Sequence, residues 1–173
     1  GGRATHEYAK AHPEKLQGII LVDAGGAPDS QPKSLPVGFR IARMPVLNQL
    51  ARIITPRSMV EKSLRQSVSN AAVVTPAEVD EYWELLRHPG NREATGKRFA
   101  LYSSRNTQTA VSDNTSQVPA LILWGDEDKL IPVSSAKWFQ STYTGNVTHI
   151  YKRIGHMPME ESADKSAEDV GNW

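Results

Sequence analysis

Two short apolar runs constrain the fold of this chain more than any other feature. Residues 18–22 read G-I-I-L-V, and residues 118–124 read V-P-A-L-I-L-W. Both runs are continuous in apolar residues rather than alternating, which is typical of strands in a parallel sheet with both faces covered. Parallel strands need a long crossover connection, which helices usually provide. The two runs therefore predict an α/β protein in which residues 18–22 form a central strand covered on both faces.

The segments around these runs extend the α/β pattern. Residues 3–12 predict a helix that ends at Pro13, because proline lacks the N–H that a continuing helix needs. Residues 134–143 predict a second helix, and residues 147–153 predict a third strand that is more polar and therefore lies nearer an edge. Residues 160–173 predict a final helix.

Residues 27–114 have a different character and predict an all-helical insertion. Prolines punctuate this stretch, and the segments between them have helical patterns. The clearest helix start is T-P-A-E at residues 75–78, where threonine caps the helix, proline takes its first position and glutamate completes a capping box. The expected main domain comprises residues 1–26 and 115–173, with parallel strands, right-handed crossovers and flanking helices.

The composition argues against several functional classes. A net charge of +1 with scattered basic residues gives no reason to expect nucleic acid or an anionic membrane as a partner. No apolar stretch approaches the roughly 20 residues that span a bilayer. Without cysteine the chain has no disulfide or thiolate metal site, and H-E-x-x-H, P-loop and G-x-G-x-x-G motifs are absent, so we expect no cofactor. The sequence leaves the oligomeric state open and favours the cytoplasm without fixing the compartment.

An acid and a histidine directly follow the last two predicted strands. Asp128 lies in W-G-D-E-D-K-L-I-P at residues 124–132, and His156 lies in G-H-M-P at residues 155–158. Because the carboxyl ends of parallel strands meet at one edge of a sheet, we expect the two side chains to lie over the same rim. A carboxylate bonded to one ring nitrogen aims a histidine for general-base catalysis. Taken separately, Asp128 is more simply a turn cap and His156 a surface loop residue.

These stretches together resemble the α/β-hydrolase superfamily. The family's acid aligns with Asp128 and its histidine with His156, within the longer match G-H-M-P-M-E-E. The start of the chain, G-G-R-A-T-H-E-Y-A-K-A-H-P-E-K-L-Q-G-I-I-L-V-D-A, resembles the segment directly after the family's nucleophile elbow, and residues 27–114 resemble its cap. The resemblance covers nearly the whole chain and implies a partial α/β-hydrolase fold with a catalytic Asp128–His156 pair.

The resemblance also implies that the nucleophile lies outside this chain. In the G-x-S-x-G elbow the serine occupies a strained strand-to-helix turn, and Gly1 aligns with the last glycine of that motif. The nucleophile is therefore expected two residues before Gly1, and the oxyanion hole and the first half of the sheet would also precede it. The implied activity of the full-length protein is serine-nucleophile hydrolysis of carboxylic esters or related carbonyl compounds, and the chain alone is expected to be inactive.

Two alternatives stay open at this point. Haloalkane dehalogenases and epoxide hydrolases place an aspartate at the elbow, although G-H-M-P-M-E-E looks more like the serine branch. The other alternative is a non-catalytic hydrolase-like binding protein or an inert fragment. Retention of both Asp128 and His156 argues mildly against a binding protein.

Several apolar residues are candidates for the substrate pocket. Leu130 and Met157 neighbour the acid and the histidine in sequence, and Trp83 lies in the insertion. An apolar lid would favour small-molecule substrates with apolar acyl or aromatic groups. The other apolar residues of the insertion, which could line the pocket or only pack the lid, are Met44, Leu47, Leu50, Ile53, Leu86 and Phe99.

Asp23 also ends a predicted strand at the same rim. A few members of the superfamily carry their catalytic acid at this place, but the simpler expectation is that Asp23 caps the turn after the strand. The remaining histidines are expected to take no part in the chemistry. His6 and His12 should have structural roles, His88 should be a loop residue, and His149 should be packed or exposed in its strand.

Overall fold

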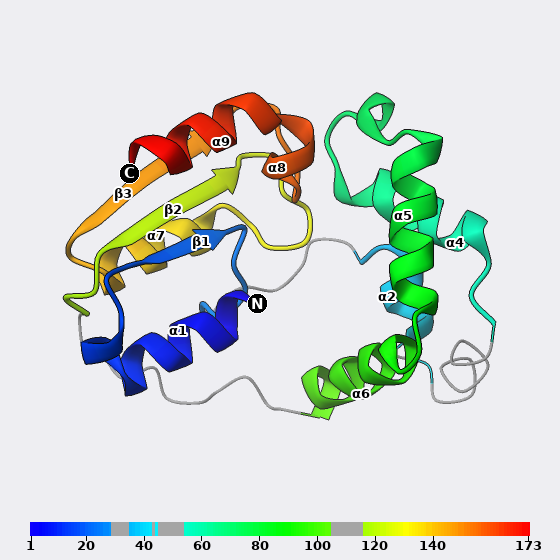
Figure 1. Cartoon of the computed structure of the whole chain (residues 1–173), viewed down its shortest axis with the longest axis horizontal. Helices are drawn as coiled ribbons and strands as arrows, with labels where there is room; N and C mark the ends of the chain where they lie inside the picture. The colour runs from blue at the N-terminus through cyan, green and yellow to red at the C-terminus, as the bar shows by residue number, and fades with distance from the viewer. Residues whose placement is uncertain (29–34, 43, 45–53, 105–115) are drawn as a thin grey trace. The chain divides into compact units, whose positions relative to one another are not determined.

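The computed structural model describes residues 1–28, 35–42, 44, 54–104 and 116–173 (Figure 1). The chain forms two compact units. The first, called the sheet unit, contains Gly1–Ser34, Val68–Asn70 and Ala110–Trp173. The second, called the helical unit, contains Leu35–Ser67 and Ala71–Thr109.

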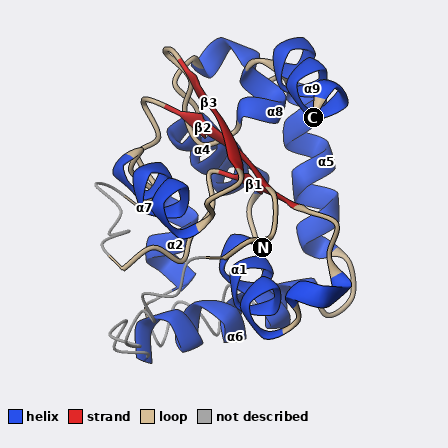
Figure 2. Cartoon of the chain, turned by 90° about the vertical axis from the view of Figure 1, so that its left-hand side faces the viewer, coloured by secondary structure: helices blue, strands red, loops and turns tan. Residues whose placement is uncertain are grey.

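The sheet unit is built on three parallel strands, which lie side by side in Figures 1 and 2. They are β1 (Ile19–Val22), β2 (Ala120–Gly125) and β3 (Asn146–Tyr151), in the order β1-β2-β3. The register pairs Leu123 of β2 with Val22 on one side and with His149 on the other. All three strands therefore end at the same edge of the sheet, and the predicted α/β class is confirmed.

Helices flank this sheet close to the predicted positions. They are α1 (Gly2–Ala11), the short 3-10 helix η1 (Pro13–Lys15), α7 (Ser134–Thr142), α8 (Pro158–Glu161) and α9 (Ala163–Asn172). The predicted final helix over residues 160–173 is in fact two helices. They are separated by Ser162, whose φ of −146° and ψ of 52° are not helical.

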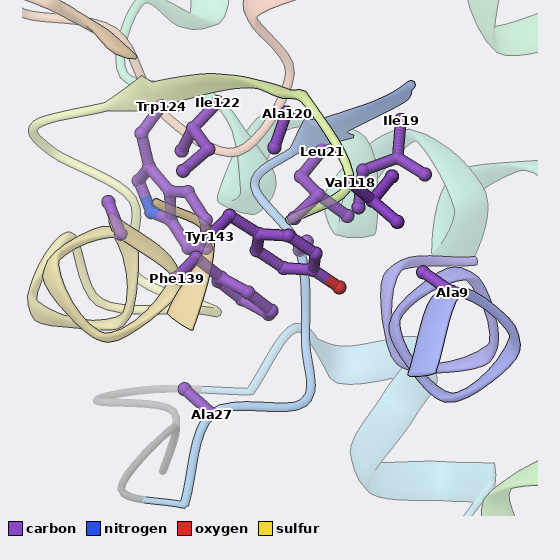
Figure 3. Packing of buried hydrophobic residues seen from close by; sticks show 12 residues of the cluster. Ala9, Ile19, Leu21, Ala27, Val118, Ala120, Ile122, Trp124, Phe139 and Tyr143 are labelled. Atoms are coloured by element: carbon purple, nitrogen blue, oxygen red, sulfur yellow. The ribbon is translucent and has the colours of Figure 1, made fainter. Parts of the chain in front are cut away.

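The larger part of the core lies between the sheet and the helices α1 and α7 (Figure 3). Alternate strand residues face these helices, as the two-residue period of a strand requires. The large buried side chains of this cluster are Leu21, Ile122, Trp124, Phe139 and Tyr143. His6 is buried beside them and bonds the Tyr143 hydroxyl at 2.8 Å, and burial lowers the pKa of His6. The opposite face of the sheet buries Leu121, Leu123 and Tyr151.

The first strand lies at an edge of the described sheet. Among the described residues β1 pairs with β2 alone, and Ile20 is 41% exposed. Helix α1 packs on β1, and the buried residues Ile19 and Leu21 belong to the cluster on that side, whereas Ile20 points to the opposite face. Within the described residues β1 is therefore an edge strand. A central position covered on both faces is an expectation for the sheet of the intact protein and stays a prediction.

In its described residues the helical unit contains helices and connections only. These helices are α2 (Val37–Ala42), α4 (Arg57–Ser67), the 3-10 helix η2 (Ala71–Val73), α5 (Pro76–Arg87) and α6 (Asn91–Ser104). The capping box is present, because Thr75 Oγ1 accepts from Glu78 N at 3.2 Å and Glu78 Oε2 accepts from Thr75 N at 2.6 Å. A cap function for residues 27–114 stays a prediction.

The sequence also predicts that no segment of the chain spans a bilayer. Within the ranges that the structure describes, no helix is both long enough and apolar enough to cross a membrane.

Candidate active site

The carboxyl ends of β2 and β3 bring the predicted acid and histidine together. Asp128 lies in the turn after β2, and His156 lies in the loop between β3 and α8. The two strands pair directly, with Gly125 opposite Tyr151 at their ends. His156 Nδ1 and Asp128 Oδ2 are hydrogen-bonded at 2.8 Å. Residues that are 28 positions apart in sequence therefore meet over one rim of the sheet.

The carboxylate of Asp128 is held by its own turn. Its Oδ1 accepts from the backbone N–H of Leu130 at 2.7 Å and of Ile131 at 3.0 Å. Trp124 Nε1 donates to the Ile131 carbonyl at 3.1 Å, which ties the turn to β2. The Asp128 side chain is fully buried, whereas the His156 side chain is 29% exposed. One carboxylate oxygen is thus fixed by the backbone and the other is aimed at the ring.

Gly125 permits the close approach of the two loops. A Cβ at this position would lie 2.0 Å from the Gly155 carbonyl oxygen and 2.4 Å from the Ile154 carbonyl oxygen. Both obstacles are backbone atoms, so no side-chain rotation could relieve them. Glycine is therefore required at this position of W-G-D-E-D. Any side chain would push the segment that carries His156 away from the end of β2.

Asp23 lies beside this pair, at the end of β1. Its backbone N–H donates to the Leu123 carbonyl at 3.0 Å, and its Oδ1 accepts from Gly125 N at 3.1 Å. The residue is 4% exposed and has a φ of 40°, a conformation that aspartate tolerates better than most residues. Burial, and secondly the negative charge of Asp128, raises the pKa of Asp23 to about 9. The Asp23 carboxyl group therefore bonds the end of β2 rather than the turn that follows β1.

These three side chains form the one group of potential metal ligands found among the described residues. Asp23, Asp128 and His156 each offer an atom within 4.8 Å of the other two. However, His156 Nδ1 already bonds Asp128, so a metal ion at that nitrogen would have to replace this hydrogen bond. The arrangement is therefore that of a hydrogen-bonded acid–histidine pair with a second carboxyl beside it.

Glu161 is a site residue that sequence reasoning missed. Its Oε1 accepts from Gly155 N at 2.8 Å, directly before His156. Its Oε2 accepts from the backbone N–H of Ser69 at 2.7 Å and of Asn70 at 3.1 Å. One carboxylate therefore holds the histidine loop and residues 68–70 of the sheet unit. The available signal was its place in G-H-M-P-M-E-E, but only the fold shows what the glutamate binds.

The predicted pocket residues belong to different units of the chain, Leu130 and Met157 to the sheet unit and Trp83 to the helical unit. Leu130 is buried, and Met157 is half-buried at the start of α8. Trp83 is half-buried in the helical unit, where its Nε1 donates to the Thr55 carbonyl at 2.9 Å. Among the lid candidates Met44 is 51% exposed and Leu86 is half-buried, whereas Leu47, Leu50, Ile53 and the side chain of Phe99 lie outside the described residues.

A hollow of about 390 Å³ in the sheet unit lies near the site but is not lined by the acid–histidine pair. Glu127 and Glu161 are on its wall, and so is Lys152. The two glutamates accept hydrogen bonds from Ser69, which also lines the hollow. Neither Leu130 nor Met157 borders it, so it is not the apolar pocket that the sequence predicts.

Comparison with known proteins adds an independent finding. A family model described as serine aminopeptidase, S33, matches residues 1–163. The chain therefore belongs to this family within the α/β-hydrolase superfamily. The resemblance inferred from the sequence motifs is confirmed at the level of the superfamily.

Individual relatives are distant. An uncharacterized protein of Mycobacterium tuberculosis is 24% identical over 172 residues, which cover 93% of this chain and 49% of the relative. The 2-hydroxy-6-oxononadienedioate/2-hydroxy-6-oxononatrienedioate hydrolase 1 of Dechloromonas aromatica is 23% identical over 170 residues, with coverage of 95% and 56%. The chain thus spans about half the length of the curated relatives that it matches.

A solved structure shows the same fold. The 2-hydroxy-6-oxo-6-phenylhexa-2,4-dienoate hydrolase (BphD) of Rhodococcus sp. strain RHA1 has a TM-score of 0.75 to this chain. The match covers 98% of this chain and 59% of that protein at 15% sequence identity. At this identity the likeness establishes the fold and not the substrate.

Proposed function

We propose that this chain supplies the acid and the histidine of a serine hydrolase that cleaves carboxylic esters or related carbonyl compounds. One observation carries the proposal: His156 Nδ1 bonds Asp128 Oδ2 at 2.8 Å while backbone amides hold the other carboxylate oxygen. A surface histidine or a turn-capping aspartate needs no such partner. Membership of a hydrolase family supports the same function.

The geometry suits a general base. An ionised carboxylate can only accept hydrogen bonds, so Nδ1 of His156 carries the ring proton and Nε2 presents its lone pair. In the proposed reaction Nε2 takes the proton of the nucleophile and then returns it to the leaving group. Asp128 keeps the ring in this tautomer and stabilises the imidazolium that forms. Water activated by the same nitrogen then releases the acyl group.

The proposed nucleophile is a serine two residues before Gly1 in the intact protein. This assignment rests on the alignment of Gly1 with the last glycine of the elbow motif. It is supported by the tight packing of α1, since a Cβ on Gly2 would lie 2.4 Å from Ala24 Cβ. Ala24 directly follows Asp23, so the start of α1 lies at the strand ends where Asp128 and His156 meet. The chain without this serine is expected to be inactive.

The proposed substrates are small carbonyl compounds with an apolar acyl or aromatic group. The Dechloromonas aromatica relative, a hydrolase of 2-hydroxy-6-oxononadienedioate and 2-hydroxy-6-oxononatrienedioate, acts on small carbonyl compounds, which supports this substrate class. Leu130, Met157 and Trp83 are the residues that we propose for substrate binding.

A fluorophosphonate probe, which reacts covalently with activated serines, tests this proposal. The intact protein should be labelled, and His156→Ala should lower the labelling rate by at least about 10³-fold because the serine loses its base. His88→Ala is the matched control, since His88 is exposed and its described hydrogen bonds are those of its backbone at the end of α5.

Two results would overturn the proposal. The first is labelling of the His156→Ala protein at the wild-type rate. The second is rapid turnover of epoxides or haloalkanes by a protein that resists the probe, which would indicate an aspartate nucleophile.

A further inference from the structure

One buried oxygen atom beside the acid–histidine pair has no hydrogen-bond partner. Asp23 Oδ2 is inaccessible to solvent, and no donor in the described part of the chain reaches it. Leaving a buried polar atom unpaired costs about 1–3 kcal/mol, so such atoms are rare in folded proteins. The atom therefore calls for a physical explanation.

The neighbours of Asp23 supply that explanation. Oxygen atoms of Asp23 and Asp128 lie within 4.8 Å of each other and of a ring nitrogen of His156. Two ionised carboxylates cannot bond each other, because both are acceptors only. A single proton between them removes the repulsion and creates a donor, as in other buried carboxyl pairs.

The hydrogen bonds indicate which carboxyl holds the proton. Asp128 accepts three hydrogen bonds, from Leu130 N, Ile131 N and the His156 ring. Asp23 accepts one, from Gly125 N. The negative charge is therefore better stabilised on Asp128, and the proton is better placed on Asp23.

The negative charges that face Asp23 also favour its protonated form. They belong to Asp128 and Glu161, while the other titratable groups near it are the His156 ring and the Tyr151 hydroxyl. Burial is the largest cause of the raised pKa of about 9, followed by the charge of Asp128, and a hydrogen bond to Asp128 is a further cause. Only the Gly125 N–H opposes them.

We infer that Asp23 is protonated at neutral pH and donates its Oδ2 proton to the carboxylate of Asp128, acting as a positioning residue for the Asp128–His156 pair. A carboxylate has about four acceptor positions, and the three hydrogen bonds on Asp128 leave one for this donor. The catalytic part of this inference rests on the proposed function, but the protonation of Asp23 does not.

The backbone conformation of Asp23 also favours an aspartate or asparagine side chain at this position. Asp23 has a φ of 40°, in the left-handed region that costs most residues about 1 kcal/mol and that asparagine and aspartate tolerate best. Asparagine is therefore the natural test substitution. Its amide oxygen can accept from Gly125 N and its NH₂ group can donate to Asp128, so it imitates the protonated form at every pH.

The first experiment measures unfolding by urea as a function of pH in the intact protein and its Asp23→Asn variant. The pKa of Asp23 rises from 3.8 to about 9 on folding, so its contribution to stability is complete below about pH 4 and is lost as the pH rises toward 9. Within that window the wild-type unfolding constant should increase about tenfold per pH unit relative to Asp23→Asn. Asp164→Asn, which removes an exposed carboxylate, should follow the wild-type curve.

The second experiment measures ester hydrolysis by the same proteins. Asp23→Ala should lower kcat about 10-fold to 100-fold with little change in KM, because loss of an outer hydrogen-bonding partner misaligns the pair. Asp23→Asn should recover most of that loss. It should also keep its activity at alkaline pH, where the wild-type rate falls as Asp23 ionises.

The outcomes separate the two claims. Parallel pH–stability curves for wild-type and Asp23→Asn would overturn the inference whatever the function of the protein. A loss of activity in Asp23→Asn as large as in Asp23→Ala would also overturn it, because Asp23 would then act as a carboxylate. If the stability curves diverge but no hydrolysis depends on His156, the proposed function fails while the protonated carboxyl stands.

Discussion

At the scale of single residues, the site depends on how Asp128 divides its two oxygens. Oδ1 accepts two amide N–H groups within its own turn, and Oδ2 accepts from His156 at 2.8 Å. The turn therefore fixes the orientation of the carboxylate independently of its hydrogen bond to His156. A side chain fixed in this way does not have to reorganise when the imidazolium forms.

Gly125 provides a test at the same scale. Gly125→Ala would place a Cβ 2.0 Å from the Gly155 carbonyl oxygen, so the loop that carries His156 must move. We expect the variant to lose about 1–3 kcal/mol or more of unfolding free energy, which urea denaturation measures. Its hydrolytic rate should fall as well, because the Asp128–His156 hydrogen bond is stretched or broken.

Gly145→Ala is the matched control for this substitution. Gly145 precedes β3, and no atom lies within 4 Å of the place that its Cβ would take. Its stability and activity should stay close to those of the wild type. Equal behaviour of the two alanine variants would show that the close approach at Gly125 is not required.

At the scale of elements, Glu161 joins segments that are distant in sequence. Its carboxylate binds the amides of Gly155, Ser69 and Asn70, so the end of α8 holds both the histidine loop and residues 68–70. Each of these donors would need a new partner if the carboxylate were removed.

Substitutions of Glu161 test whether its carboxylate stabilises the segments that it joins. Glu161→Ala should lower the unfolding free energy by about 1–3 kcal/mol, since it leaves backbone donors without their acceptor. Glu161→Gln should lose less, because its amide oxygen still accepts. Glu168→Ala, at an exposed position of α9, should change stability little. Thermal unfolding of the three variants measures the difference, and equal melting temperatures would contradict the bridging role.

The order of the elements could be predicted from the sequence, because each strand is a compact apolar run and each connection has helical character. Asp128 and His156 could be named for the same reason, since each directly follows a strand. The roles of Asp23 and Glu161 could not, because their partners come from chain segments up to 102 and 92 positions away. The exposure of Ile20 also depends on what packs against β1, which its local sequence does not contain.

At the scale of the whole molecule, the chain consists of a sheet unit that carries the acid–histidine pair and a helical unit that carries Trp83. The sheet unit contains the three side chains that meet at the candidate site, Asp23, Asp128 and His156. The helical unit lies within residues 27–114, the segment that we expect to act as a cap. The chain covers 49% and 56% of the two relatives described above, and the activity that we propose for the intact protein includes a serine outside the given sequence.

The central claim is that Asp128 and His156 act as one catalytic unit, and a double-mutant cycle on the intact protein tests it most directly. Asp128→Asn should lower kcat/KM for an activated ester by about 10³-fold to 10⁴-fold when His156 is present. In the His156→Ala background the same change should have an effect of less than about threefold, because residues that act as a unit are not additive. An equal loss in both backgrounds, or near wild-type rates for either single variant, would contradict the account.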